Sequence, residues 1–124
     1  MRILASIMED YLVREIDKIG EMLMFIVKRL GLMEDVRTDY TVADVKAEFE
    51  KAGLPLNLDA LLQKDNPVSY LVRDKKLSDS GLEAFIDIVF HSDLEEEKKA
   101  ALLEDALAYL DGKGYYSFRL HSFR

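Results

Sequence analysis

The feature that most constrains this chain is a row of apolar residues near its N-terminus. Steps of four and three residues separate its members, which are Leu12, Ile16, Ile19, Leu23, Ile26, Leu30 and Met33. Such spacing places them along one side of an α-helix, and that side packs against other helices. Residues 22–27 are all apolar, so they occupy every side of the helix. We therefore expect a helix over about residues 6–30, covered by the rest of the chain, by a second subunit, or by both.

The size and composition fit one domain without cysteine chemistry. The 124 residues suit a single hydrophobic core, and we take residues 1–124 as one helical domain. The absence of cysteine excludes thiol nucleophiles and suits a reducing compartment. The apolar run is shorter than the about 20 residues of a membrane span. Glu9 and Asp10 interrupt the opening residues before a signal-peptide core could form. We expect a cytoplasmic protein without a membrane contact.

The distribution of charge argues against a polyanionic partner. The net charge is −7, and residues 113–124 hold three basic residues and no acidic one. Affinity for nucleic acid comes chiefly from clustered Lys and Arg that neutralise phosphates. We therefore exclude duplex nucleic acid as the main partner.

Capping signals predict several short helices in the middle of the chain. Thr41 precedes Asp44 by three residues, Asn57 precedes an apolar run, and Asn66 stands before Pro67. Each arrangement satisfies the exposed N–H groups at a helix start.

The sequence also predicts two further capping boxes. The predicted helices and the turns between them leave few residues for β-strands. Ser80 with Glu83 and Ser92 with Glu95 match the strict capping-box spacing, so we expect them to open the next two helices. Gly53, followed by a proline two residues on, ends the helix that starts near Thr41. The predicted fold is all-α: a helical bundle or short solenoid-like array of five to seven helices with a long N-terminal helix.

The C-terminal segment, residues 115–123, fits either a strand or a helix. Its apolar residues alternate, and Tyr116, Leu120 and Phe123 also fall at helical spacing. We favour a helix, because a lone strand would have unpaired edges in a helical domain. On that interpretation these three side chains enter the core.

The same segment interleaves aromatic and basic residues. We expect Arg119 and Arg124 to offset the acidic helix over residues 93–112. An alternative is a stacking platform for single-stranded nucleic acid, which would need exposed rings.

No catalytic or cofactor motif is present, so the sequence predicts a protein that is not an enzyme and holds no cofactor or metal. His91 and His121 are the natural general bases, but neither has a nucleophile arrangement around it. A metal site can be drawn from His91, Asp93 and Glu97. The better interpretation is a helix start, where acidic side chains complement the helix dipole.

Part of the chain resembles a known group of proteins. Residues 10–16 (DYLVREI), Gly20 and residues 30–32 (LGL) are similar to the opening of small, uncharacterised bacterial all-helical proteins. Residues 106–110 (ALAYL) before residues 116–118 (YSF) follow a similar order. The resemblance implies a domain of unknown function with helical hairpins like those of tetratricopeptide repeats, and it implies no catalytic residue.

The leading functional hypothesis follows from the apolar excess on the first helix. We expect a non-enzymatic protein-interaction module that self-associates as a homodimer through its N-terminal helix and presents a groove to a protein or peptide partner. The candidate interaction surface consists of Met22, Phe25, Ile26 and Arg29.

The alternative is a small-molecule-binding domain or a weak enzyme. Its pocket would be lined by Tyr11, Tyr70, Tyr109 and Tyr116, with His91 or His121. A closed cavity with converging polar groups would support this alternative.

Overall fold

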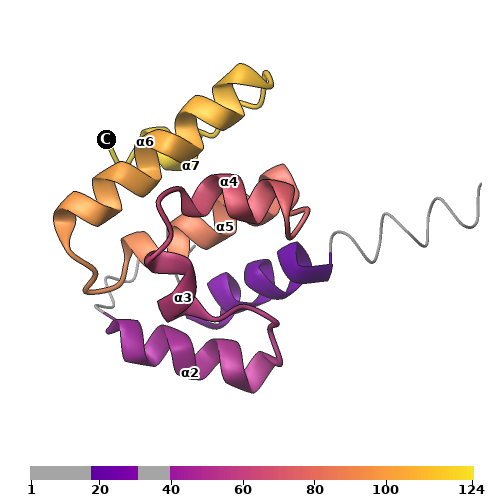
Figure 1. Cartoon of the computed structure of the whole chain (residues 1–124), viewed down its shortest axis with the longest axis vertical. Helices are drawn as coiled ribbons and strands as arrows, with labels where there is room; N and C mark the ends of the chain where they lie inside the picture. Colours follow the sequence, from indigo (N-terminus) through magenta and orange to yellow (C-terminus); the bar gives the residue numbers. More distant parts are fainter. Residues whose placement is uncertain (1–17, 31–39) are drawn as a thin grey trace, which may run out of the picture.

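A computed structural model describes residues 18–30 and 40–124 of the chain (Figure 1). Residues 18–29 are helical, and we call them the N-helix. The helices that follow are α2 (Val42–Ala52), α3 (Leu58–Leu62), α4 (Pro67–Arg73), α5 (Asp79–Phe90), α6 (Glu96–Gly112) and α7 (Phe118–His121). In these two ranges no strand forms, and Tyr40 and Ser92 make an isolated bridge. The all-α class is thus confirmed. The expected helix over residues 6–17 lies outside the described residues.

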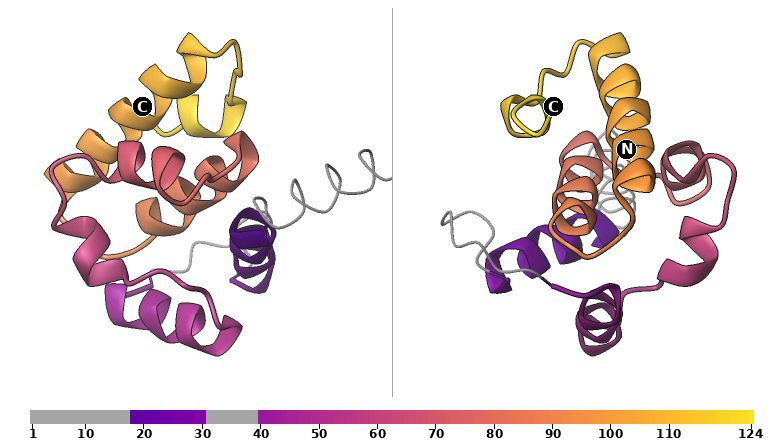
Figure 2. Two further views of the ribbon diagram at one scale, coloured as in Figure 1. Left: turned by 45° about the vertical axis from the view of Figure 1, so that its right-hand side comes forward. Right: turned by 90° about the vertical axis from the view of Figure 1, so that its left-hand side faces the viewer.

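Helix α5 lies at the centre of the fold, with α6 on one side and α2 on the other (Figures 1 and 2). It contacts α2, α4, α6 and α7. The N-helix also crosses α5 closely, because a Cβ added at Gly81 would lie 2.8 Å from the Cα of Gly20. Two glycines therefore allow the two helix backbones to approach.

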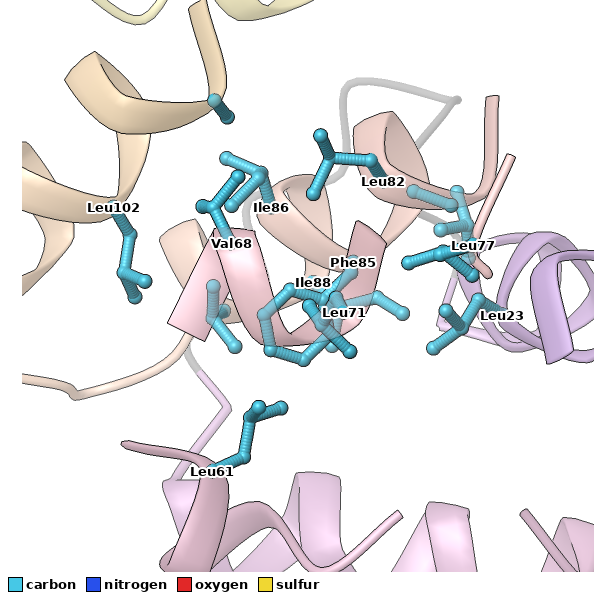
Figure 3. Close-up of a cluster of buried hydrophobic side chains, with 14 of the residues drawn as sticks. Leu23, Leu61, Val68, Leu71, Leu77, Leu82, Phe85, Ile86, Ile88 and Leu102 are labelled. Carbon is cyan, nitrogen blue, oxygen red and sulfur yellow. The ribbon is translucent and has the colours of Figure 1, made fainter. Parts of the chain in front are cut away.

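One hydrophobic core joins the N-helix and α2–α7. Figure 3 shows the part of it where Leu23 of the N-helix, Leu71 of α4 and Phe85 of α5 lie. Leu23, Ile26 and Leu30 of the apolar row are buried, and Ile19 is half-buried. The sequence therefore predicted correctly which side of the N-helix packs inward. Phe85 at the middle of α5 is fully buried, as is Leu120 of α7.

Three predicted caps are confirmed. The side chain of Thr41 accepts a hydrogen bond from the Asp44 N–H, and the Asp44 carboxylate accepts one from the Thr41 N–H. Asn57 and Asn66 cap α3 and α4 through their side-chain oxygens. Gly53 ends α2 in the left-handed conformation, with φ of 68°.

The other two predicted caps are wrong. Ser78, not Ser80, caps α5 by accepting from the Gly81 N–H at 3.1 Å. Helix α6 begins at Glu96, and its N-cap residue, Glu95, makes no side-chain capping bond. The Ser92 hydroxyl instead donates to the Val89 carbonyl at the end of α5. The pattern at Ser92 therefore stabilises the turn after α5 rather than the start of α6.

The C-terminal segment contains a helix, but a shorter one than its spacing suggested. Ser117 caps α7, which places Leu120 in the core and leaves Phe123 half-buried. Tyr116 precedes the helix and is 58% exposed, so its predicted place in the core is wrong.

Within residues 18–30 and 40–124, no helix combines the length and the apolar character that crossing a membrane requires.

Candidate interaction surface

The N-helix is apolar on a side that the core does not cover. Leu23 and Ile26 are fully buried, whereas the Phe25 side chain between them in sequence is 57% exposed. Met24 is 43% exposed on another side of the helix. Exposure of an aromatic side chain on a well-packed helix costs free energy that burial against a partner would recover.

Phe25 borders a shallow hollow between the N-helix and α2. Glu21, Met22 and Phe25 line it from the N-helix, and Ala52 lines it from α2. Its volume is about 260 Å³. Ala52 contributes only a methyl group to this wall, so the hollow can accept a bulky apolar side chain from outside.

Opposite charges flank the Phe25 ring along the N-helix. Glu21 lies one turn before Phe25, and Arg29 lies one turn after it. The Nε of Arg29 is 3.4 Å from a carboxylate oxygen of Glu48 on α2, and the Arg29 side chain remains 50% exposed. We call Glu21, Met22, Phe25, Arg29 and Ala52 the N-helix face.

Three of the four residues predicted for an interaction surface reach this face. Met22 is half-buried beside the hollow, while Phe25 and Arg29 are exposed. Ile26 is fully buried, so it belongs to the core of this chain and cannot meet a partner. Sequence reasoning missed Glu21 and Ala52, although Glu21 stands one helical turn before Phe25.

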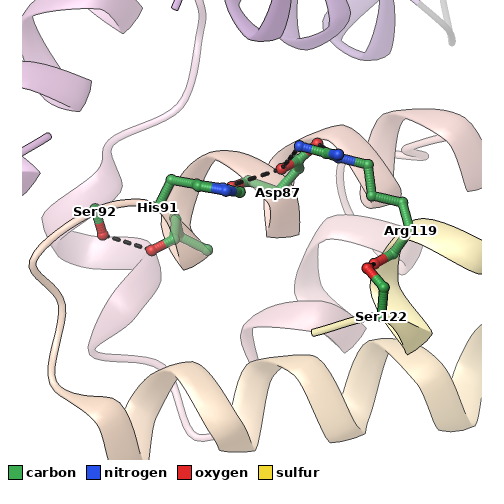
Figure 4. A network of polar contacts seen from close by, with 6 residues as sticks. Asp87, His91, Ser92, Arg119 and Ser122 are labelled. Carbon is green, nitrogen blue, oxygen red and sulfur yellow. Dashed lines mark hydrogen bonds and ion pairs between the residues drawn. The ribbon is translucent and has the colours of Figure 1, made fainter. Parts of the chain in front are cut away.

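A buried ion pair ties α7 to α5 (Figure 4). The Asp87 side chain is 4% exposed, and Arg119 donates to it from Nε at 2.5 Å and from Nη2 at 3.1 Å. The Nδ1 of His91 lies 3.2 Å from the same carboxylate. Arg119 was predicted to offset the acidic sixth helix; its partner is instead Asp87 of α5. Arg124 does reach α6, at 3.1 Å from Glu104.

This polar network contains Asp87, His91 and Ser92, but these residues are not arranged to activate Ser92 as a nucleophile. The Ser92 hydroxyl donates to the Val89 carbonyl at 2.6 Å and accepts from the Leu94 N–H. His91 is oriented toward Asp87 and its backbone carbonyl. We conclude that the network holds α5 and α7 together.

The residues considered for a metal site do not converge. The Asp93 carboxylate accepts from the Val42 N–H at the start of α2, and His91 is engaged with Asp87. In the described part of the chain, no three His, Cys, Asp or Glu side chains gather so as to hold a metal ion.

The hollow beside Tyr109 does not bring together the tyrosines expected to line one pocket. The hollow beside Tyr109 has neither Tyr70 nor Tyr116 in its wall. Tyr116 instead stacks on His121, with ring centroids 4.5 Å apart. Tyr11 lies outside the described residues.

A larger hollow, of about 540 Å³, lies where α2 turns into α3. Lys46 and Asp59 form an ion pair at its wall. A hydrogen bond from Lys46 to the Asp59 carboxylate raises the pKa of the Lys46 ammonium. The pair neutralises both of its charges, and Glu50 and Asn57 also line this hollow.

A second exposed aromatic group lies at the C-terminus. Phe118 is 82% exposed, and its ring contacts Tyr116 edge to face at a centroid distance of 4.8 Å. The neighbouring His121 is paired with Asp111, and Arg119 with Asp87. Acidic partners therefore balance the cations that a nucleic-acid platform would need.

No family model matches the chain, and no curated protein or solved structure matches it either. The resemblance to small bacterial proteins with tetratricopeptide-like hairpins therefore stays a prediction. Function has to be argued from the surface of this chain.

Proposed function

We propose that this protein is a non-enzymatic, cytoplasmic protein-interaction module that self-associates through the N-helix face. The observation that carries the proposal is Phe25, which is 57% exposed beside a hollow although its neighbour Ile26 is fully buried. Phe, Met and Arg are enriched in protein interfaces, and all three occur on this face.

The N-helix is a rigid platform for such a contact. Leu23 and Ile26 anchor it in the core, and Gly20 crosses Gly81 of α5 at close range. A preorganised helix loses little conformational entropy on binding. Full burial of a Phe side chain contributes roughly 1.5–3 kcal/mol, and Phe25 is already partly buried, so the two Phe25 rings of a symmetric contact contribute part of the free energy that a dimer needs.

The proposal gives the histidines a structural role. Nδ1 of His91 contacts Asp87, and Nε2 of His121 lies 3.2 Å from Asp111. His91 thus links the end of α5 to the preceding turn of the same helix, and His121 links α7 to α6. The lack of cysteine suits the reducing cytoplasm.

Two variants with the same substitution test the proposal. Phe25→Glu and Phe118→Glu each replace an exposed phenylalanine with a carboxylate, one on the N-helix face and one far along the chain. Sedimentation equilibrium of the full chain should show a dimer at tens of micromolar for the wild type and for Phe118→Glu. Phe25→Glu should sediment as a 14.3 kDa monomer with unchanged helicity by circular dichroism.

Two results would overturn the proposal. One is a wild-type protein that stays monomeric at hundreds of micromolar. The other is a dimer that Phe118→Glu disrupts and Phe25→Glu does not, which would move the contact to the C-terminal aromatic group.

A further inference from the structure

We propose, resting on the function proposed above, that two copies of the chain pack with their N-helices antiparallel about a twofold axis beside Phe25. In this arrangement Glu21 of each copy meets Arg29 of the other copy. The partner is thus a second copy of this chain in a defined register.

The register follows from the positions of the charges on the N-helix. Glu21 and Arg29 are four residues before and four residues after Phe25, so each lies about 6 Å from it along the helix axis. A twofold axis at Phe25 reverses the helix direction and carries position 21 onto position 29. A negative and a positive side chain then face each other on both sides of the axis.

The parallel register lacks this match. It would place Glu21 against Glu21 and Arg29 against Arg29 of the second copy, and like charges in contact oppose association. The N-helix face therefore selects the antiparallel pairing from the order of its own charges.

The intramolecular contact of Arg29 is compatible with this role. Its Nε lies against Glu48, whose side chain is only 18% exposed, and this contact holds the guanidinium beside α2. A guanidinium has five N–H donors in a fixed fork, so it can bridge Glu48 and a second carboxylate. Arg29 is thereby oriented before the second copy arrives.

The hollow supplies the apolar part of the contact. Its wall contains Phe25 itself together with Met22 and Ala52. Under the twofold axis the Phe25 ring of each copy enters the hollow of the other. The two aromatic rings then meet near the axis, with Glu21 and Arg29 at the rim.

Charge exchange in the full chain tests the register. The variants are Glu21→Arg, Arg29→Glu and the two combined, with Lys98→Glu on the exposed start of α6 as a control for net charge. Each single variant should raise the dimer dissociation constant about tenfold, because it places like charges together. The combined variant should bind about tenfold more tightly than Arg29→Glu, since it restores opposite pairs between the copies and both proteins share the carboxylate placed beside Glu48. Lys98→Glu should behave as the wild type.

Disulfide formation between introduced cysteines gives a second test of the register. The chain has no cysteine of its own, so a disulfide can join only the introduced residues. A mixture of Glu21→Cys and Arg29→Cys proteins should form a disulfide-linked dimer under mild oxidation. Glu21→Cys alone should form far less.

The outcomes separate this inference from the proposed function. If Phe25→Glu abolishes the dimer but the combined charge variant stays as weak as the single ones, self-association stands and the antiparallel register is wrong. Efficient pairing of Glu21→Cys with itself would likewise overturn the register, in favour of a parallel pair. A monomeric wild type would remove both proposals.

Discussion

The buried ion pair between Asp87 and Arg119 predicts a marked asymmetry between two substitutions. Arg119→Met removes the cation and leaves the Asp87 carboxylate, which is 4% exposed, without its main partner. Asp87→Asn removes the charge and leaves a guanidinium whose side chain is 30% exposed and can reach water. The first change should therefore destabilise the fold much more than the second.

The magnitudes follow from burial. Breaking a buried pair by removing one partner costs 3–5 kcal/mol, and the remaining contact with His91 at 3.2 Å favours the lower end, about 3 kcal/mol. Asp87→Asn should cost about 1 kcal/mol, since the amide can still accept one hydrogen bond from Arg119. The double variant should cost about 1.5 kcal/mol, which gives a coupling energy of about 2.5 kcal/mol.

Urea denaturation followed by circular dichroism measures all four free energies of unfolding. At this chain length 1 kcal/mol corresponds to about 4 °C, so Arg119→Met should lower Tm by about 12 °C. Equal costs for the two single variants, or a coupling energy below about 0.5 kcal/mol, would show that the pair behaves as a solvent-exposed one.

Three further changes have defined outcomes. Gly81→Ala should lower the unfolding free energy by about 1–3 kcal/mol, because its methyl group would overlap the Gly20 backbone; an unchanged midpoint in urea would contradict the close crossing. Leu120→Ala should cost about 2–5 kcal/mol, since Leu120 is fully buried, and a loss below about 1 kcal/mol would mean that α7 is not docked. Burial, together with the Glu83 carboxylate, raises the pKa of the Tyr115 hydroxyl above 10. The folded state therefore binds the Tyr115 hydroxyl proton more tightly than the unfolded state does. The stability that this difference contributes is fully present below pH 10 and is lost as the pH rises through the pKa of the folded state. Tyr115→Phe should flatten that alkaline loss, and a pH dependence identical to that of the wild type would refute the assignment.

Local signals in the sequence located most helix starts because a cap involves only a few neighbouring residues. Thr41, Asn57 and Asn66 each accept a hydrogen bond from the N–H group three residues on, and no tertiary contact is needed. At the start of α5, Ser78 and Ser80 were both possible N-cap residues. Leu77 and Leu82 are both in the core and flank a cap at Ser78 in the spacing of a hydrophobic staple, which explains the choice of Ser78 over Ser80.

The N-helix shows what periodicity can and cannot provide. The row of apolar residues predicted correctly which side of the N-helix is buried. Ile26 belongs to that row, so the same pattern places it in the core, and its assignment to the interaction surface was wrong. The hollow beside Phe25 was not predictable, because Ala52 reaches it only through the packing of α2.

The pairing of α5 with α7 was outside the reach of local patterns. Asp87 and Arg119 are 32 residues apart, and only the folded chain brings them together. One sequence signal was available: Asp87 is the sole charged residue in the run from Ala84 to Phe90. A charge inside an apolar helical run predicts a buried partner, although it does not say which residue provides it.

Nuclear magnetic resonance of the wild-type chain during dilution tests the central claim most directly. The Phe25 ring and the Met22 methyl group should shift as the protein is diluted from millimolar to micromolar concentration, following one dimer dissociation constant. The Phe118 ring should stay unchanged in the same spectra. Constant shifts for Phe25 and Met22 over that range would contradict self-association through the N-helix face.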